Sequence, residues 1–579
     1  MSGSNLGMTG LAPGETSPPG ASSRGPWARL RAYWLTPAGV TILAVTALAF
    51  AIRVFTLTRS GYLTGVTEYD DGVYLGGAIR LLQGDLPYHD WAFVQPPGIL
   101  VLMIPVALLT KVTTATHAMA AARILTALAS TACVPLLGTL VRHRGALVTL
   151  VTCGILAVYP DDITTAHTLI LEPWMNVLLL TGACLAFRQG RLAGSRRLLW
   201  AGAAIGAAGA VKFWAALPAL VLLVVCLISV PGPVRWRRAG PYAAGVLAGF
   251  LVPTLPFALT APVTFVRSTL LDQAARDGSY VPVSMRLAHI TGLIDFLNGN
   301  GHFSLTAASR SLFASGGAAT TPSTSAGWLS YAVALLAAAL VAAGYVARRV
   351  RPSPLEWFAL VTAVLASAAV IMYSAFFYHY PDFGAPWIAI AAGGASAALS
   401  FRTLSFRTLS FRTQAFQTRA FRARASGWSP RRLIGSIGFV FFLLASFQAY
   451  EMSGLAAPDI YPDQAVIPSG ACVVTDQVSM ALAANRFTPA AAGCPDVMDS
   501  LAETLVLSDG VSVQGGAASL PHVVAAWQSI FAKADYVWLS PNNARRIPWT
   551  PGLSSWFDAH FLKLDVAGGM GTVYKRVGA

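Results

Sequence analysis

Residues 37–57 read PAGVTILAVTALAFAIRVFTL, an apolar run long enough to cross a membrane as one helix. At 1.5 Å per residue, about twenty helical residues span the roughly 30 Å of hydrocarbon in a bilayer. Similar runs follow at 118–141, 146–160, 171–187, 198–212, 214–231, 240–259, 326–347, 355–374, 384–400 and 434–450. The sequence therefore predicts an all-α polytopic membrane protein with about 11 transmembrane helices.

The composition agrees with this prediction. Of the 579 residues, 55% are hydrophobic and only 11% are charged, whereas soluble domains carry roughly 25% charged residues. This excludes a soluble globular enzyme, a disordered protein and a small secreted protein held by disulfides.

The net charge of +15 would suit a nucleic-acid-binding protein, but the basic residues are placed differently. Before residue 455 most of them lie in short clusters between the apolar runs, at 24–31, 142–144, 188–197, 235–238, 348–351 and 402–432. Such clusters mark the cytoplasmic side of a membrane protein. We therefore expect a multi-pass protein of the plasma membrane that binds no nucleic acid, with its N-terminus cytoplasmic and its C-terminus outside.

This topology divides the chain into three parts. Residues 1–36 are expected to form a disordered cytoplasmic tail, and residues 37–450 a transmembrane domain with external loops at 58–116 and 260–325. Residues 401–433 are expected to form a cytoplasmic loop, and the five-residue pattern LSFRT, which begins at Leu399, repeats into it. This loop is either an expanded linker or a segment that lies on anionic lipid.

Residues 455–579 differ from the rest of the chain, with 7 basic and 10 acidic residues and short apolar runs at 471–475 and 535–539. We predict a small extracytoplasmic α/β domain. Cys472 and Cys494 are its only cysteines, and because disulfides form outside the cytoplasm, we expect the two to be bridged.

The segment that follows the first helix carries the strongest chemical signal. Residues 67–74 read TEYDDGVY and place Glu68, Asp70 and Asp71 within four positions. One acid suffices to cap the helix predicted over 72–83, so a capped, solvated turn explains the three acids poorly. The alternative is an acid or base pair at the membrane face.

This segment continues as AIRLLQGDLPYHD at 78–90 and VQPPG at 94–98. The whole pattern resembles the first external loop of the GT-C glycosyltransferases. The most similar in style are the protein O-mannosyltransferases, the lipid A aminoarabinose transferases and their actinobacterial relatives. The runs CVVTDQ at 472–477 and RRIPW at 545–549 also resemble the C-terminal part of actinobacterial members.

The resemblance implies an integral membrane glycosyltransferase. It would transfer a sugar such as mannose or arabinose from a polyprenyl-phosphate donor to an extracytoplasmic glycan, protein or lipid, as a hexosyl- or pentosyltransferase. By position, Asp70 matches the catalytic aspartate of the family and Asp71 the acid that follows it. Asp70 would be the general base of an inverting single displacement.

Lys212 is the leading candidate for binding the lipid phosphate. It is one of five lysines against 35 arginines and interrupts an apolar stretch, where a charge is costly and usually functional; the alternative is a lysine that reaches out to the membrane interface. Gln95 stands where some relatives have a phosphate-binding lysine, and Arg80 is a weaker phosphate candidate. The candidate substrate-binding residues are Glu68, Tyr74, Arg80, Gln95, Lys212, and His379 and Tyr380 of FFYHYP at 376–381.

A second external loop contains Asp161, Asp162, His167 and Glu172. These residues could hold a divalent cation, but their spacing is a weak metal signal, and a structural or acceptor-facing role ranks ahead of it. No cofactor is otherwise predicted.

Two other functions remain open, a transporter or lipid flippase and a non-catalytic factor for envelope assembly. A transporter should show internal repeats and broken polar helices at mid-membrane, neither of which is evident in the sequence. Gln95 favours the non-catalytic alternative, whereas Asp70 and Asp71 oppose it.

Overall fold

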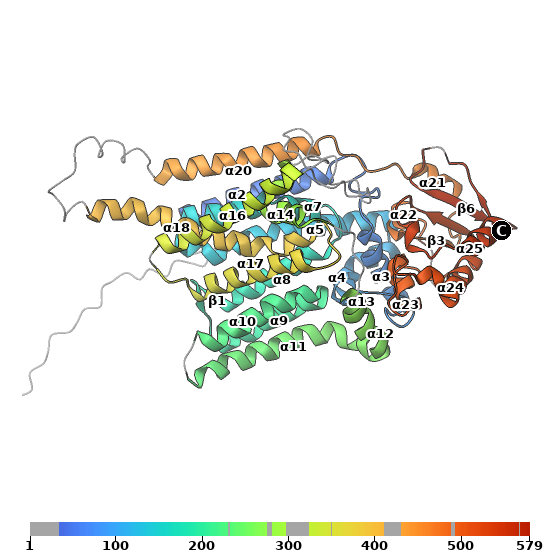
Figure 1. Ribbon diagram of the computed structural model, residues 1–579, viewed down its shortest axis with the longest axis horizontal. Coiled ribbons are helices and arrows are strands. Elements are labelled where there is room, and N and C mark those ends of the chain that lie inside the picture. The colour runs from blue at the N-terminus through green and yellow to red at the C-terminus, as the bar shows by residue number, and fades with distance from the viewer. Residues whose placement is uncertain are drawn as a thin grey trace, which may run out of the picture.

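The computed structural model describes residues 34–229, 232–274, 281–296, 324–348, 350–409, 430–487, 493–566 and 568–578. Within these ranges a helix lies at each predicted apolar run: α2 (Pro37–Leu57), α5 (Ala115–Val141), α6 (Ala146–Ala157), α8 (Leu171–Ala186), α9 (Ser195–Val211), α10 (Ala216–Ile228), α11 (Val234–Thr260), α16 (Thr324–Ala347), α17 (Pro354–Met372), α18 (Ala385–Leu409) and α20 (Pro430–Met452). These helices pack side by side into one elongated bundle (Figure 1).

The fold is that of a polytopic helical membrane protein, as predicted. Among the described residues, six helices are long and apolar enough to cross a membrane, with α2, α5 and α11 among them. Several others, such as α6 and α8, are apolar but shorter. The count of eleven spans stays a prediction.

Small residues bring α9 and α11 into backbone contact. A Cβ atom at Gly206 of α9 would lie 2.9 Å from the backbone nitrogen of Phe250. A Cβ atom at Gly249 of α11 would lie 2.8 Å from the carbonyl carbon of Ala203. Close approach at small residues is typical of helix pairs in membranes, because lipid gives them no hydrophobic drive to associate.

At one end of the bundle, Arg144 and Arg348 lie beside the short hairpin of β1 (Phe187–Arg188) and β2 (Arg191–Leu192). Glu356 stands among these basic residues, where it completes the capping box of α17 with Ser353. It also pairs with Arg348 and with Arg144, whose Nη2 atom lies 2.8 Å from Glu356 Oε2. The acid at the basic end is therefore neutralised.

Short elements cover the opposite end, beside the C-terminal domain (Figure 1). They are α3 (Asp70–Gln83), α4 (Gly98–Ala107), α7 (Pro160–Thr165), α12 (Pro262–Val266), the π-helix η4 (Arg267–Leu271), α13 (Asp272–Ala274), α14 (Val283–Thr291) and the 3₁₀ helix η6 (Tyr380–Phe383). The helix predicted at 72–83 is α3.

The C-terminal domain is a small α/β domain, as predicted. Its strands, β3 (Val473–Thr475), β4 (Tyr536–Leu539), β5 (Phe561–Lys563) and β6 (Thr572–Arg576), pair in the order β3-β4-β6-β5. Only the β3–β4 pair is parallel. Its helices are α21 (Tyr461–Val466), α22 (Val478–Ala483), α23 (Ser500–Leu507), α24 (Pro521–Ala532) and α25 (Pro551–His560).

The sheet of this domain packs on α24 and α25 around Trp527, Phe531 and Val537. A disulfide joins Cys472 to Cys494, with their Cα atoms 5.5 Å apart. The domain lies on the bundle through α22, which packs on α3.

Glycine permits the contact between α22 and α3. A Cβ atom at Gly72 would lie 2.6 Å from the carbonyl carbon of Val478. Of the remaining segments, the tail up to residue 33, parts of the 260–325 loop and residues 410–429 of the repeat lie outside the described residues. The first LSFRT units lie in α18.

Candidate functional site

A pocket lies where α3, the start of η6 and the C-terminal domain meet. Its lining contains seven residues that the sequence analysis selected, namely Glu68, Asp70, Tyr74, Gln95, Lys212, His379 and Tyr380. Tyr69, Val73, Phe93, Val94, Phe377, Tyr378, Asp499 and Arg546 complete it. Most of these side chains are polar or aromatic, which suits a ligand with both a charged group and a ring.

The first turn of α3 presents Asp70 to this pocket. Tyr74 lies one helical turn further on, and its hydroxyl donates to Asp70 Oδ2 over 3.3 Å. A carboxylate at a helix N-terminus is stabilised as an anion by the helix dipole. Asp70 can therefore accept a proton from a group that enters the pocket.

Asp71 does not join Asp70 in the pocket, which corrects the expectation of a catalytic acid pair. Its side chain is fully buried beside Arg123 of α5, whose Nη2 and Nε atoms lie 2.5 and 3.2 Å from Asp71 Oδ2. The backbone N–H of Leu169 donates to the other oxygen over 2.6 Å. Consecutive residues point about 100° apart on a helix, so only one of two adjacent acids can face the pocket.

Glu68 lies directly before α3 and accepts two hydrogen bonds. The hydroxyl of Tyr378 donates to its Oε2 atom over 2.7 Å, and the backbone N–H of Tyr69 to its Oε1 atom over 2.9 Å. Burial raises the pKa of Glu68, and the nearby charge of Asp70 raises it further. Glu68 therefore takes up a proton more readily than an ordinary glutamate.

Lys212 lies where α9 ends and the short helix η3 (Phe213–Ala215) begins, and its backbone is extended there. It is 5% exposed and forms an ion pair with Glu172 of α8. Its Nζ atom also lies 4.3 Å from the centre of the Tyr380 ring. Lys212 thus lines the pocket as a buried, paired cation, and the alternative of a lysine that reaches the interface is wrong.

His379 and Glu172 are neighbours in the same cluster. His379 Nδ1 lies 2.9 Å from Glu172 Oε1, the oxygen that also receives Lys212. The sequence analysis placed Glu172 in a separate acidic loop. The structure instead places Glu172 in contact with two pocket residues, Lys212 and His379.

The other residues of that loop have separate partners. Asp161 pairs with His289 of α14, at 2.9 Å, and the His167 ring lies 5.1 Å from that of Tyr62. Among the described residues no group of three or more acids, histidines and cysteines could hold a metal ion.

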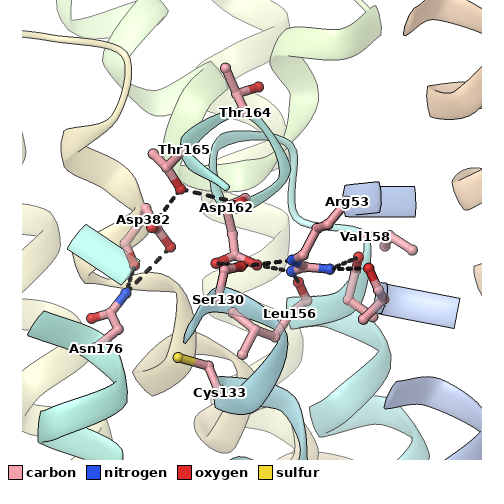
Figure 2. A network of polar contacts seen from close by, with 12 residues as sticks. Arg53, Ser130, Cys133, Leu156, Val158, Asp162, Thr164, Thr165, Asn176 and Asp382 are labelled. Carbon is pink, nitrogen blue, oxygen red and sulfur yellow. Dashed lines mark hydrogen bonds and ion pairs between the residues drawn. The ribbon is translucent and has the colours of Figure 1, made fainter. Parts of the chain in front are cut away.

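Figure 2 shows where Asp162 lies. Inside the bundle it forms an ion pair with Arg53 of α2 and accepts from the Ser130 hydroxyl over 3.0 Å. Asp382 of η6 lies in the same network, where Thr165 donates to it over 3.0 Å. The network joins α2, α5, α7 and η6, and none of its members lines the pocket.

Arg80 also lies outside the pocket, contrary to its selection as a phosphate ligand. Its Nε atom lies 2.8 Å from Asp496 of the C-terminal domain, and its guanidinium group lies 4.7 Å from the centre of the Phe487 ring. Gln95 does line the pocket, where the hydroxyl of Tyr88 donates to its carbonyl oxygen over 2.5 Å.

Sequence reasoning assigned no role to two pocket residues from the C-terminal domain, Asp499 and Arg546. Asp499 accepts from the Tyr69 hydroxyl over 2.8 Å and caps α23 through the backbone N–H groups of Leu501 and Ala502. The guanidinium carbon of Arg546 lies 4.1 Å from the centre of the Tyr69 ring. The segment 545–549 was noted only for its resemblance to relatives.

Comparisons with known proteins identify the fold. ArnT from Cupriavidus metallidurans, solved bound to undecaprenyl phosphate, aligns with a TM-score of 0.52 and 14% sequence identity over 93% of this chain and 98% of that chain. The apo form of the same protein aligns with a TM-score of 0.53 and 15% sequence identity, over the same shares of the two chains. No protein-family model and no curated protein matches the sequence.

Proposed function

Because the chain has the GT-C fold, we propose that it is a membrane glycosyltransferase that uses a polyprenyl-phosphate-linked sugar. The acceptor would be a glycan, protein or lipid hydroxyl on the extracytoplasmic side. A solved neighbour of the same fold binds undecaprenyl phosphate, which supports this class of donor. The main support is the pocket itself, because it gathers Asp70, Lys212 and His379 from distant parts of the chain.

In this proposal Asp70 is the general base. It takes the proton of the acceptor hydroxyl, whose oxygen then forms a bond to the anomeric carbon of the sugar. The bond from that carbon to the phosphate oxygen breaks, and the electron pair leaves with the polyprenyl phosphate. A single displacement inverts the anomeric configuration.

Lys212 would stabilise the departing phosphate. An ammonium group has three N–H donors. The ion pair with Glu172 occupies one side of the Lys212 ammonium group. Charge-assisted bonds to a phosphate are about twice as strong as neutral hydrogen bonds. Tyr74 and Tyr380, which also line the pocket, offer aromatic surface and hydroxyl groups to the sugar.

The test is sugar release from a panel of polyprenyl-phosphate donors by protein in lipid vesicles. Asp70→Asn keeps the shape of the side chain and removes the base, so we expect a loss of at least about a hundredfold. The control is Asp90→Asn. Asp90 is an exposed acid of the same loop, and the amide oxygen of asparagine can still accept from the Leu86 N–H. Equal rates for wild type and Asp70→Asn, or no turnover of any donor, would contradict the proposal.

A further inference from the structure

Arg546 is a cation of the pocket that has no role in the proposed chemistry. It comes from the 3₁₀ helix η9 (Ala544–Arg546) of the C-terminal domain and lines the pocket beside residues of α3. Its Nη1 atom is buried and has no hydrogen-bond partner among the residues that the structure describes. A buried guanidinium donor without an acceptor is costly, so its retention calls for a ligand.

The surroundings of Arg546 fix its position. Its backbone carbonyl accepts from the hydroxyl of Thr504 in α23 over 2.8 Å, and its backbone N–H donates to Asn543 over 2.8 Å. Thr504 is itself held by the indole N–H of Trp527, at 3.1 Å. The core of the domain therefore anchors the backbone from which the guanidinium group extends.

The head of the side chain is positioned as well. It lies against the face of the Tyr69 ring, 4.1 Å from the ring centre, an arrangement favoured by the quadrupole of the ring. It also interacts electrostatically with Asp499 and Asp70. An arginine held in this way keeps its planar set of donors ready for an anion.

Lys212 and Arg546, the lysine and the arginine of the pocket lining, differ in how their N–H donors are paired. Lys212 already pairs with Glu172, whereas Arg546 has a buried donor atom for which the described part of the chain supplies no acceptor. Guanidinium groups bind phosphate oxygens in pairs with matching geometry. The free donor therefore suits a phosphate group better than it suits a neutral hydroxyl.

We propose that Arg546 binds the phosphate of the polyprenyl carrier, so that the C-terminal domain supplies part of the donor site. This inference rests on the proposed function and adds to the donor site a phosphate-binding residue from outside the helical bundle. Lys212 and Arg546 then hold one phosphate from two separate parts of the chain. The C-terminal domain would be required for donor binding itself.

The experiment measures binding rather than turnover. Full-length protein in nanodiscs is titrated with undecaprenyl phosphate and, separately, with undecaprenol, which has the same chain without the phosphate. Inorganic phosphate is a third ligand and distinguishes a lipid-linked from a free phosphate. The variants are Arg546→Gln, Arg546→Lys and, as a matched control, Arg545→Gln, because Arg545 is the exposed neighbour.

We expect Arg546→Gln to lower the affinity for undecaprenyl phosphate about tenfold to a hundredfold, the effect of one or two charge-assisted hydrogen bonds. Binding of undecaprenol should not change, and Arg545→Gln should bind as wild type does. Arg546→Lys keeps the charge and loses the planar fork, so it should fall in between. If Arg546→Gln fails to fold, the affinity of Arg546→Lys for undecaprenyl phosphate tests the proposal instead.

The outcomes separate this inference from the proposed function. If the wild type prefers undecaprenyl phosphate to undecaprenol and the Arg546 variants bind as tightly, Arg546 is not a phosphate ligand and the proposed function stands. Tighter binding of inorganic phosphate than of the lipid would contradict a lipid-linked ligand. If the wild type does not distinguish the two lipids, the proposed donor class is wrong.

Discussion

Glu172 and Lys212 form a buried ion pair beside the pocket, although they come from α8 and from the break after α9. The same oxygen of Glu172 lies 2.9 Å from His379 Nδ1. One carboxylate therefore positions two pocket residues from two other parts of the chain. An acid outside the pocket lining can thus fix the positions of residues within it.

Glu172→Gln should destabilise the protein, because it leaves Lys212 buried without a counter-ion. Breaking a buried ion pair from one side typically costs about 3–5 kcal/mol, which thermal unfolding in detergent would detect. The double variant Glu172→Gln with Lys212→Met removes both charges and should regain most of this loss. It should still fail to transfer sugar; recovery of transfer would show that Lys212 is dispensable.

Asp71→Asn should affect stability, whereas Asp70→Asn should affect turnover. Asparagine at position 71 can still accept from the Leu169 N–H, but Arg123 then remains as an uncompensated buried charge. We expect the unfolding free energy to fall by about 3–5 kcal/mol. Asp70→Asn should unfold close to wild type, and the reverse assignment would contradict the placement of the two acids.

Gly72→Ala should loosen the C-terminal domain. The added methyl group would lie 2.6 Å from the carbonyl carbon of Val478, the first residue of α22. Hydrogen exchange in α22 should speed up, and donor binding should weaken with it. Gly240→Ala in α11 is the control, since it meets nothing within 4 Å and alanine favours a helix; equal exchange in both variants would refute the close contact.

The stability of the C-terminal domain should fall between about pH 4.5 and pH 7. Burial raises the pKa of Glu503 from 4.5 to about 7, against a smaller lowering by the backbone of Ala92. A raised folded-state pKa means that the native protein binds this proton more tightly than the unfolded chain does. The contribution is therefore complete below the unfolded pKa and is lost as the pH rises through about 7.

Glu503→Gln tests this sign. The variant should lose this part of the pH dependence and be more stable than wild type above pH 7, as measured by hydrogen exchange of α23 at several pH values. Burial also raises the pKa of Asp496, to about 6, so some pH dependence should remain. An unchanged pH profile in the Glu503→Gln variant would contradict the assignment.

The sequence predicted the helical bundle well, because apolar runs of membrane length leave the chain few alternatives. It also selected Asp70, Lys212 and His379, since charged or polar side chains beside such runs rarely serve packing alone. It named Asp70 as the general base but placed Asp71 beside it as the second acid of the site. The orientation of Asp71 depends on Arg123, which is 52 positions away and buried against it.

Arg546 and Asp499 were missed for a related reason. Their role depends on how the C-terminal domain lies on α3, which is a contact between distant segments rather than a local pattern. Arg80 was selected wrongly because its partner, Asp496, comes from the same domain. The local sequence shows that a charged residue is unusual at its position, but only the folded chain shows which residue pairs with it.

The hydrogen bond between Tyr69 and Asp499 joins residues 430 positions apart. The ribosome makes Asp70 of α3 long before it makes Asp499 and Arg546, which line the same pocket. A chain that terminates between α3 and Asp499 therefore carries the acid of the pocket without the two residues that the C-terminal domain adds to it.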